Sequence, residues 1–237
     1  MLAAAAVAPG PPLLVPELAG AAASETAGMR AAVLSMAAGL AGLAQHWIIL
    51  GTDGAGGEFG PAAAGTFGGY GREIVVTLGQ PGAEPDPMLP LPVLIGGWIR
   101  GQAAPDATCE ARIVNAGLAA VEALAWGRAL RAELDADPRA IGVLLVADGS
   151  IRLTEKAPGA LDPRAVEWED RLAAALDTGD QQFLAALDAQ ACQAMGVADR
   201  AAWTVLAGLF PDGPARVTDR HDSAPYGVGY HVGIWLP

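Results

Sequence analysis

The sequence predicts a single α/β domain in which helices flank a central mixed, largely parallel sheet. Three observations lead to this prediction. Short apolar runs of strand length alternate with amphipathic segments of helix length along the chain. With 237 residues, the chain fits one large domain that can bury a sizeable core. It contains no internal repeat and no evident linker, so the predicted domain spans residues 1–237.

The first half of the chain predicts three strands and two helices. The strands cover residues 2–8, 47–50 and 73–78. The helices, whose apolar residues recur every three or four positions, cover residues 17–44 and 91–102. Two connections stand out, one rich in glycine (55–71) and one rich in proline (79–90). The length and aromatic content of the first favour a functional loop over a simple connection.

The second half continues the alternation. Strands are predicted over residues 111–115, 141–146 and 226–235. Helices are predicted over 118–134 and 162–176, followed by two or three short helices within 180–209. Asp162 followed by Pro163 is typical of a helix start, because the aspartate caps the helix and proline fits its first turn.

Composition excludes several classes of partner. The formal net charge is −12, which disfavours nucleic acids and anionic lipid surfaces. No uninterrupted apolar run reaches the length of about 18 residues that a membrane-spanning helix needs. The apolar start lacks a basic leader and is stopped by Pro9, so we interpret it as a buried strand and not as a signal peptide. Two cysteines without a Cys-x-x-Cys pattern favour a reducing, cytoplasmic location.

The loop after residues 141–146 is the most function-like stretch of the sequence. It begins with Asp148 and Ser150 and continues through Arg152 and Glu155 to Lys156, the one lysine of the chain. A buried strand that ends in such residues places them at the carboxyl edge of a sheet, where open α/β proteins bind ligands. The simpler alternative is a solvated surface loop.

The three histidines offer limited chemistry. His221, beside Asp222, is the best candidate for proton transfer, because histidine titrates near neutral pH. His46 is expected to be exposed, and His231 to be a packing or surface residue. No metal-binding, phosphate-loop or Gly-x-Ser-x-Gly motif occurs, so no metal ligand is predicted from a motif.

Two further constellations are conceivable. One is a carboxylate site built from Asp53, Asp148 and His221. The other is a nucleophilic pair of Ser150 and Lys156, whose geometry nothing in the sequence fixes.

Several segments together resemble a known family. Residues 7–17, the loop from Asp148 to Arg164, and the segment from Ala224 to Tyr230 are similar to class III extradiol ring-cleavage dioxygenases of the catalytic B-subunit type. The resemblance spans nearly the whole chain and is strongest to an actinobacterial branch. It implies the class III extradiol dioxygenase-like version of the predicted α/β fold.

The resemblance also implies where iron ligands should be. The family binds non-haem Fe(II) through two histidines and a carboxylate, and a further histidine acts as acid and base. The corresponding positions hold Gly10, Asp53-Gly54 and Arg152, so all three imidazoles are replaced. Because the facial triad has no spare ligand, ordinary Fe(II) binding is not expected, and the cofactor is unknown.

Three hypotheses follow. The first is an oxidoreductase-like protein of unknown substrate whose rebuilt cleft binds a small anionic ligand. Its candidate catalytic residues are Arg152, Lys156 and His221. Its candidate cleft residues are Gly10, Asp53, Gly54, Asp148, Ser150, Glu155 and Tyr226. The second is a catalytically inactive binding or scaffold protein on the same fold, and a homo-oligomer, most simply a dimer, is expected. The third is a true dioxygenase with unusual ligands such as Asp53, His221 or Glu17.

Overall fold

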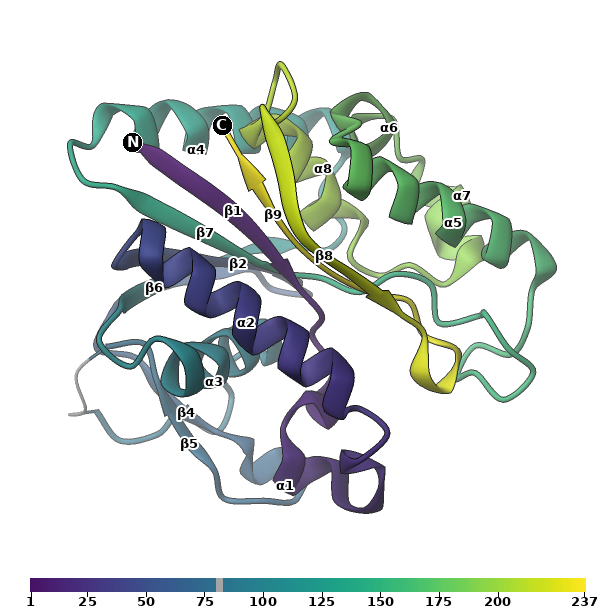
Figure 1. Ribbon diagram of the computed structural model, residues 1–237, viewed down its shortest axis with the longest axis horizontal. Helices are drawn as coiled ribbons and strands as arrows, with labels where there is room; N and C mark the ends of the chain where they lie inside the picture. Colours follow the sequence, from purple (N-terminus) through teal and green to yellow (C-terminus); the bar gives the residue numbers. More distant parts are fainter. Residues whose placement is uncertain (80–82) are drawn as a thin grey trace.

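Four parallel strands form the centre of the molecule in the computed structural model, which describes residues 1–79 and 83–237. In order across the sheet they are β6 (Thr108–Asn115), β2 (His46–Asp53), β7 (Ile141–Val146) and β1 (Leu2–Ala8). Antiparallel strands extend both sides: β3 (Gly57–Phe59) beside β6, and β9 (Tyr230–Leu236) then β8 (Arg216–Ser223) beside β1. The described residues therefore form a mixed, largely parallel sheet (Figure 1).

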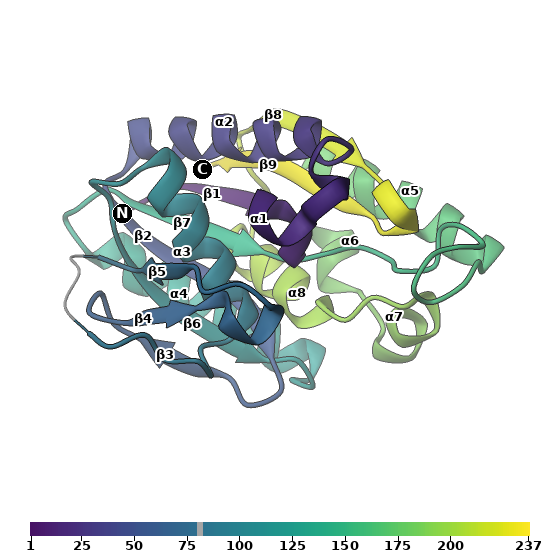
Figure 2. The same cartoon turned by 90° about the horizontal axis from the view of Figure 1, so that it is seen from below.

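Helices cover both faces of this sheet (Figures 1 and 2). One face carries α2 (Ala27–Leu43) and α3 (Leu91–Ala103), with the short α1 (Pro16–Ala19) nearby. The other face carries α4 (Ala120–Ala136), α5 (Pro163–Thr178), α6 (Gln181–Ala185), α7 (Ala189–Met195) and α8 (Arg200–Leu209). This arrangement confirms the predicted fold class of a layered α/β domain.

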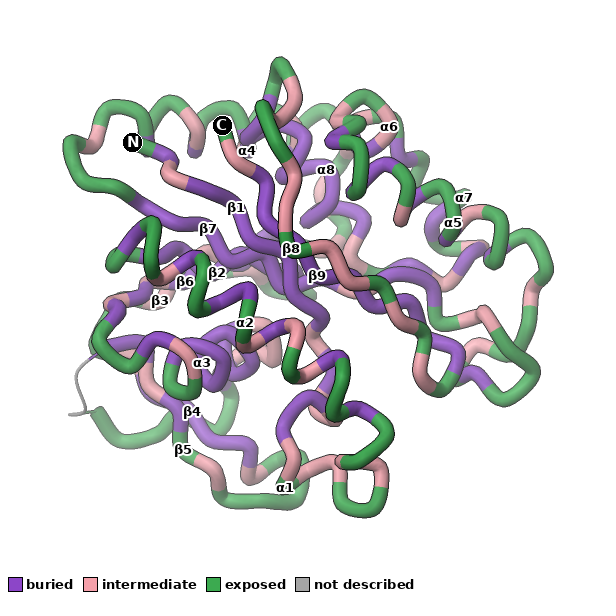
Figure 3. Tube along the Cα trace, in the orientation of Figure 1, coloured by how far each residue is buried: buried purple, intermediate pink, exposed green. Residues whose placement is uncertain are grey.

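β1 and β7 are apolar along their whole length because helices bury them from both sides. All six residues of β7 are buried, and six of the seven residues of β1 are buried. Figure 3 shows this burial along β1, β7 and β2, whereas exposed residues alternate with buried ones along α2. Among the described residues, no helix has the length and hydropathy needed to cross a membrane.

Most predicted elements are present, two of them with the predicted bounds, 2–8 and 141–146. The helix predicted over 17–44 is wrong as one unit. It is divided into α1, a 3-10 turn (Gly20–Ala23) and α2, and the chain turns at Gly20, whose φ is +56°. A residue with a side chain rarely adopts this left-handed conformation.

The glycine-rich connection over 55–71 is more ordered than predicted. It contains β3, β4 (Ala64–Thr66) and a 3-10 turn (Phe67–Tyr70). β4 pairs with β5 (Val75–Thr77), which is the predicted strand over 73–78 in a shortened form. The proline-rich connection over 79–90 includes residues 80–82, which lie outside the described residues.

The carboxyl-terminal hairpin also corrects the sequence prediction. β8 was not predicted, because its sequence is polar and half-exposed, as suits an edge strand. The strand predicted from residue 226 begins instead at Tyr230. A 3-10 turn (Pro225–Gly227) precedes it, and within that turn Tyr226 has a φ of +59°.

The connections of β1 and β7 leave the sheet toward opposite faces. β1 leads to α2 on one face, whereas the neighbouring β7 leads to α5 on the other (Figure 1). Such a divergence is the place where open α/β sheets bind ligands, outside the carboxyl ends of the strands. The fold therefore directs attention to the residues after Ala8 and Val146.

The close approach of α4 and α8 gives a first prediction. A Cβ on Gly127 of α4 would lie 2.9 Å from the Cα of Gly208 and would overlap the carbonyl oxygen of Val205. Because backbone atoms cannot give way, Gly127→Ala is expected to lower the free energy of unfolding by about 2–4 kcal/mol. Gly42→Ala, in α2 with open space around it, is the matched control and should be neutral or stabilising by about 0.5–1 kcal/mol. Urea unfolding measures both; equal effects would contradict the close packing.

Candidate functional site

The carboxyl ends of β1 and β7 are joined by a hydrogen bond between Gly10 and Asp148. The backbone N–H of Gly10 donates to Oδ1 of Asp148 over 2.8 Å. A Cβ at Gly10 would lie 3.1 Å from Cγ1 of Val146, which is tighter than ordinary packing. The structure therefore brings together two of the residues that the sequence predicts for the site.

A second carboxylate, that of Asp199, lies beside Asp148. Asp199 precedes α8 and accepts hydrogen bonds from the hydroxyl of Thr52, at the end of β2, and from the backbone N–H of Asp148 over 2.9 Å. Both aspartates are half-buried. The edge of the sheet thus carries two neighbouring acidic groups that retain some contact with solvent.

These surroundings alter the acidity of both groups. Burial, and then the negative charge of Asp199, raise the pKa of Asp148 to about 7, although the N–H of Gly10 acts in the opposite direction. Burial also raises the pKa of Asp199, against the hydrogen bonds from Thr52 and Asp148. Asp148 can therefore accept or release a proton near neutral pH.

A buried histidine bridges two further carboxylates next to this edge. Nε2 of His231, on β9, lies 2.8 Å from Oε1 of Glu169, on α5. Nδ1 of the same ring lies 2.7 Å from Oδ1 of Asp222, on β8. Two ionised carboxylates at the two ring nitrogens are best satisfied by an imidazolium, which donates to both.

The pKa of His231 reflects this balance. Burial lowers it, but the hydrogen bonds and charges of Asp222 and Glu169 outweigh burial, so the pKa of His231 is raised above its ordinary value. The pKa of Asp222 is lowered: burial opposes the shift, and the hydrogen bond from His231 and the charge of Arg220 exceed it. We refer to Glu169, His231 and Asp222 as the histidine bridge.

The histidine bridge is connected to the edge that carries Asp148. The backbone N–H of Ser150 donates to Oε2 of Glu169 over 2.8 Å. The ring of Trp203 meets His231 edge-on with centroids 6.2 Å apart, and its Nε1–H donates to the carbonyl oxygen of Asp148 over 3.2 Å. A displacement of the histidine bridge would therefore also displace the backbone around Asp148.

Ser150 and Arg152 have structural contacts. The hydroxyl of Ser150 is buried and donates to the carbonyl oxygen of Met195. The guanidinium of Arg152 donates from Nη1 to the carbonyl oxygen of Ala194 over 2.9 Å. Both side chains thus hold the loop after β7 against the last turn of α7.

The remainder of that loop is exposed. Glu155 and Lys156 lie at the surface, and Lys156 lines neither of the two cavities described below. The backbone N–H of Leu153 donates to the carbonyl oxygen of Gly227 over 3.1 Å, which places the loop against the turn that carries Tyr226. The hydroxyl of Tyr226 donates to Oε2 of Glu25 over 2.7 Å.

Asp53 ends β2, Gly54 follows it, and both are exposed. The carbonyl oxygen of Gly54 accepts from Nδ2 of Asn115, over 2.7 Å, at the end of the neighbouring β6. His221 is half-buried on β8, opposite Val232, and its neighbour Asp222 is the residue that reaches the histidine bridge. His46 is exposed, as predicted, at the start of β2.

The residues present do not fit the Fe(II) centre that the family resemblance implies. Gly10 has no side chain to bind a metal, and the guanidinium of Arg152 donates to the backbone carbonyl oxygen of Ala194. Both ring nitrogens of His231 already face carboxylates. Within residues 1–79 and 83–237, no group of three or more His, Cys, Asp or Glu side chains is placed to hold a metal ion. We therefore derive no chemistry through iron.

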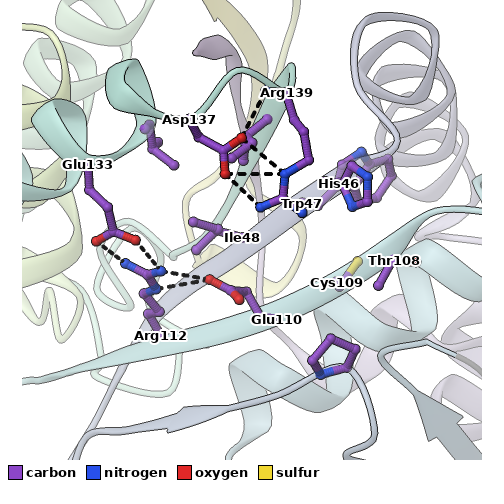
Figure 4. A pocket seen from close by; sticks show the side chains of 13 residues that line it. His46, Trp47, Ile48, Thr108, Cys109, Glu110, Arg112, Glu133, Asp137 and Arg139 are labelled. Atoms are coloured by element: carbon purple, nitrogen blue, oxygen red, sulfur yellow. Dashed lines mark hydrogen bonds and ion pairs between the residues drawn. The ribbon is translucent and has the colours of Figure 1, made fainter.

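A cavity of about 380 Å³ lies at the opposite, amino edge of the parallel strands (Figure 4). Its charged side chains are already paired. Arg112 bonds both Glu110 and Glu133, and Arg139 bonds Asp137 (Figure 4). Because each arginine has a carboxylate partner, this cavity offers little free charge to a ligand.

The sequence does not predict Asp199, Glu169 or the two carboxylate partners of His231, whose burial agrees with the packing alternative. One signal was available for Glu169: with Ala165, Leu172 and Leu176 it falls on the buried face of α5, where a charged residue needs a partner. The partner itself comes from a strand 62 residues later, and local pattern does not reveal it.

Comparison with known proteins supports the fold alone. No protein-family model and no curated protein sequence matches the chain. One similar solved structure is that of an uncharacterized protein, JW3007 from Escherichia coli K12, with a TM-score of 0.56 and 13% identity. The match covers 99% of this chain and 100% of that protein. At this identity, the similarity extends to the arrangement of helices and strands.

The acidity of Asp148 gives a second prediction. Its raised pKa means that the folded state binds a proton that the unfolded state has released, so stability falls as pH rises from about 4 to about 7. Asp148→Asn removes the charge and is expected to raise the free energy of unfolding by on the order of 2 kcal/mol at pH 8, with little change at pH 4.

Urea unfolding at the two pH values measures this difference. Asp53→Asn, at the exposed end of β2, is the matched control and should change stability by less than about 0.5 kcal/mol at either pH. Destabilisation by Asp148→Asn at pH 8 would show that the folded protein prefers the ionised carboxylate.

Proposed function

We propose that this chain is a small-molecule-binding relative of the class III extradiol dioxygenases that does not use Fe(II). In this proposal, it retains the oxidoreductase-like fold and binds its ligand at the carboxyl ends of β1 and β7. The observation that carries the proposal is the contact between Gly10 and Asp148. A glycine N–H and a carboxylate are joined at the position where the resemblance expects an iron-binding histidine.

Asp148 is the group at this edge that is suited to proton transfer. Its pKa, raised to about 7 by burial and by Asp199, suits a group that gives a proton to a ligand or takes one from it. Partial exposure of both aspartates lets a ligand reach them. Proton transfer at a bound small molecule is therefore the reaction that we assign to the edge.

The sequence predicted an anionic ligand, held by Arg152 and Lys156. Arg152 is committed to the carbonyl oxygen of Ala194, which leaves Lys156 as the cation available to an anion in this loop. Asp148 and Asp199 instead favour a ligand that donates hydrogen bonds. The anionic ligand stays a prediction, which Lys156→Ala tests through binding of benzoate.

The alternative is a catalytically inactive binding or scaffold protein on the same fold. It is favoured by Ser150 and Arg152, because the hydroxyl of the first and Nη1 of the second each donate to a backbone carbonyl oxygen. A cytoplasmic location agrees with Cys109 and Cys192, which are free and buried. The homo-oligomer, most simply a dimer, remains part of either proposal.

Metal reconstitution tests the proposal against a true dioxygenase. Purified protein incubated anaerobically with Fe(II) and then desalted is expected to retain well below one iron per chain, because the part of the chain that the structure describes places no donor group of three to hold it. Catechol and oxygen should then give no ring-cleavage product. Iron near one per chain together with catechol cleavage would overturn the proposal.

A further inference from the structure

A cavity of about 350 Å³ lies beside the histidine bridge, between α5, the loop after β7 and the β8–β9 hairpin. Figure 1 shows α5 and this hairpin on the same side of the molecule. The volume falls within the range of small-molecule sites, about 300–1,000 Å³. The cavity is formed by elements that the fold already fixes, because His231 and Glu169 join β9 to α5 beside it.

The charged groups that line this cavity are predominantly acidic. They are Glu169, Asp170 and Asp222, with His231 as the basic group of the lining. Arg220 does not line the cavity but pairs with Asp222, and its Nη2 lies 2.6 Å from Oδ1 of that residue. Three carboxylates against one imidazolium and one guanidinium leave the cavity net negative, in a protein whose own net charge is −12.

Unused acceptors accompany this charge. His231 and Arg220 both bond Oδ1 of Asp222, whereas no donor within residues 1–79 and 83–237 bonds Oδ2. Ser223 also lines the cavity, and its Oγ is shielded from solvent without a hydrogen-bond partner among the described residues. A shielded polar atom without a partner costs free energy, which a bound donor would recover.

The remaining wall is apolar. Leu153 and Val166 line the cavity together with Ala173 and Ala224. The side chain of Val166 is 41% exposed although it lies on a helix that packs against the sheet. A ligand with an apolar body would cover this surface while its polar end meets the carboxylates.

We propose that this cavity binds a small organic ammonium ion, a primary amine with an apolar body. The ammonium group donates to Asp222 and Ser223 near Asp170, and the apolar part lies against Leu153 and Val166. A metal ion does not suit the site, because both nitrogens of His231 are taken by carboxylates. An anion is repelled by the lining. The proposal is independent of the function assigned to Asp148.

Titration of the whole protein with benzylamine, n-butylamine and putrescine tests the proposal, with benzyl alcohol and benzoate as neutral and anionic counterparts. Backbone amide NMR at pH 7 localises binding. At least one amine is expected to shift the signals of Gly229 and His231 in a saturable manner, with a dissociation constant of about 1 mM or lower. The alcohol and the carboxylate should not shift them.

Two variants of α5 supply the matched comparison. Asp170→Asn removes an exposed carboxylate of the lining and is expected to weaken amine binding about threefold or more. Glu167→Gln removes an equally exposed carboxylate that is not part of the lining and should leave binding unchanged. Ser223→Ala should weaken binding as well.

Three results would overturn the proposal. They are saturation by none of the three amines, equal binding of benzyl alcohol, and equal effects of Asp170→Asn and Glu167→Gln. The last result would indicate that amines respond to the general negative charge of the protein and not to this cavity.

Discussion

The paired burial of Glu169 and His231 is the interaction on which much of this structure depends. It ties α5 to β9 across 62 residues of sequence, and Asp222 extends it to the edge strand β8. Removing either partner would leave a buried charge without compensation, which is far more costly than losing an exposed ion pair. The carboxylate also needs room: a Cβ on Gly149 or on Gly229 would overlap it. The space that the buried carboxylate of Glu169 occupies therefore requires glycine at both positions.

The same interaction organises the acidic edge of the sheet. Glu169 accepts from the backbone of Ser150, and this contact positions the loop that carries Asp148. Trp203 joins the two groups from the other side, since its ring meets His231 and its N–H bonds the backbone of Asp148. The result is one connected polar region at the carboxyl ends of β1 and β7, two strands that are themselves apolar throughout. Four carboxylates in this region favour protons and cations over anions.

The sequence predicts the position of Asp148 well and its surroundings poorly. A buried strand over 141–146 followed by Asp148 is sufficient to place that residue at the carboxyl edge. Arg152 was assigned to an anion because the sequence shows its charge but not the carbonyl oxygen of Ala194 that it bonds. For the same reason, the sequence alone indicates only a packing or surface residue at His231. Its two partners come from other elements, and long-range contacts of this kind leave no local pattern.

The helices and strands show the same contrast between features that the local sequence determines and features that long-range contacts determine. β1 and β7 have strong apolar signals and were placed correctly, because burial on both faces dictates their composition. β8 has the polar composition of an edge strand, and only its pairing with β9 makes it a strand. It nevertheless carries Asp222, so the part of the fold that was hardest to predict supplies a residue of the histidine bridge.

The protonation of His231 is the most direct test of this account. Nitrogen-15 NMR of the imidazole ring across pH 5–9 would report whether both ring nitrogens carry a proton. At pH 6.5, the ordinary pKa of histidine, most of the His231 rings are expected to carry both protons, since Asp222 and Glu169 outweigh the burial that lowers the pKa. A ring that is already neutral at pH 6 would show that burial dominates, and the histidine bridge would not be an ionic interaction.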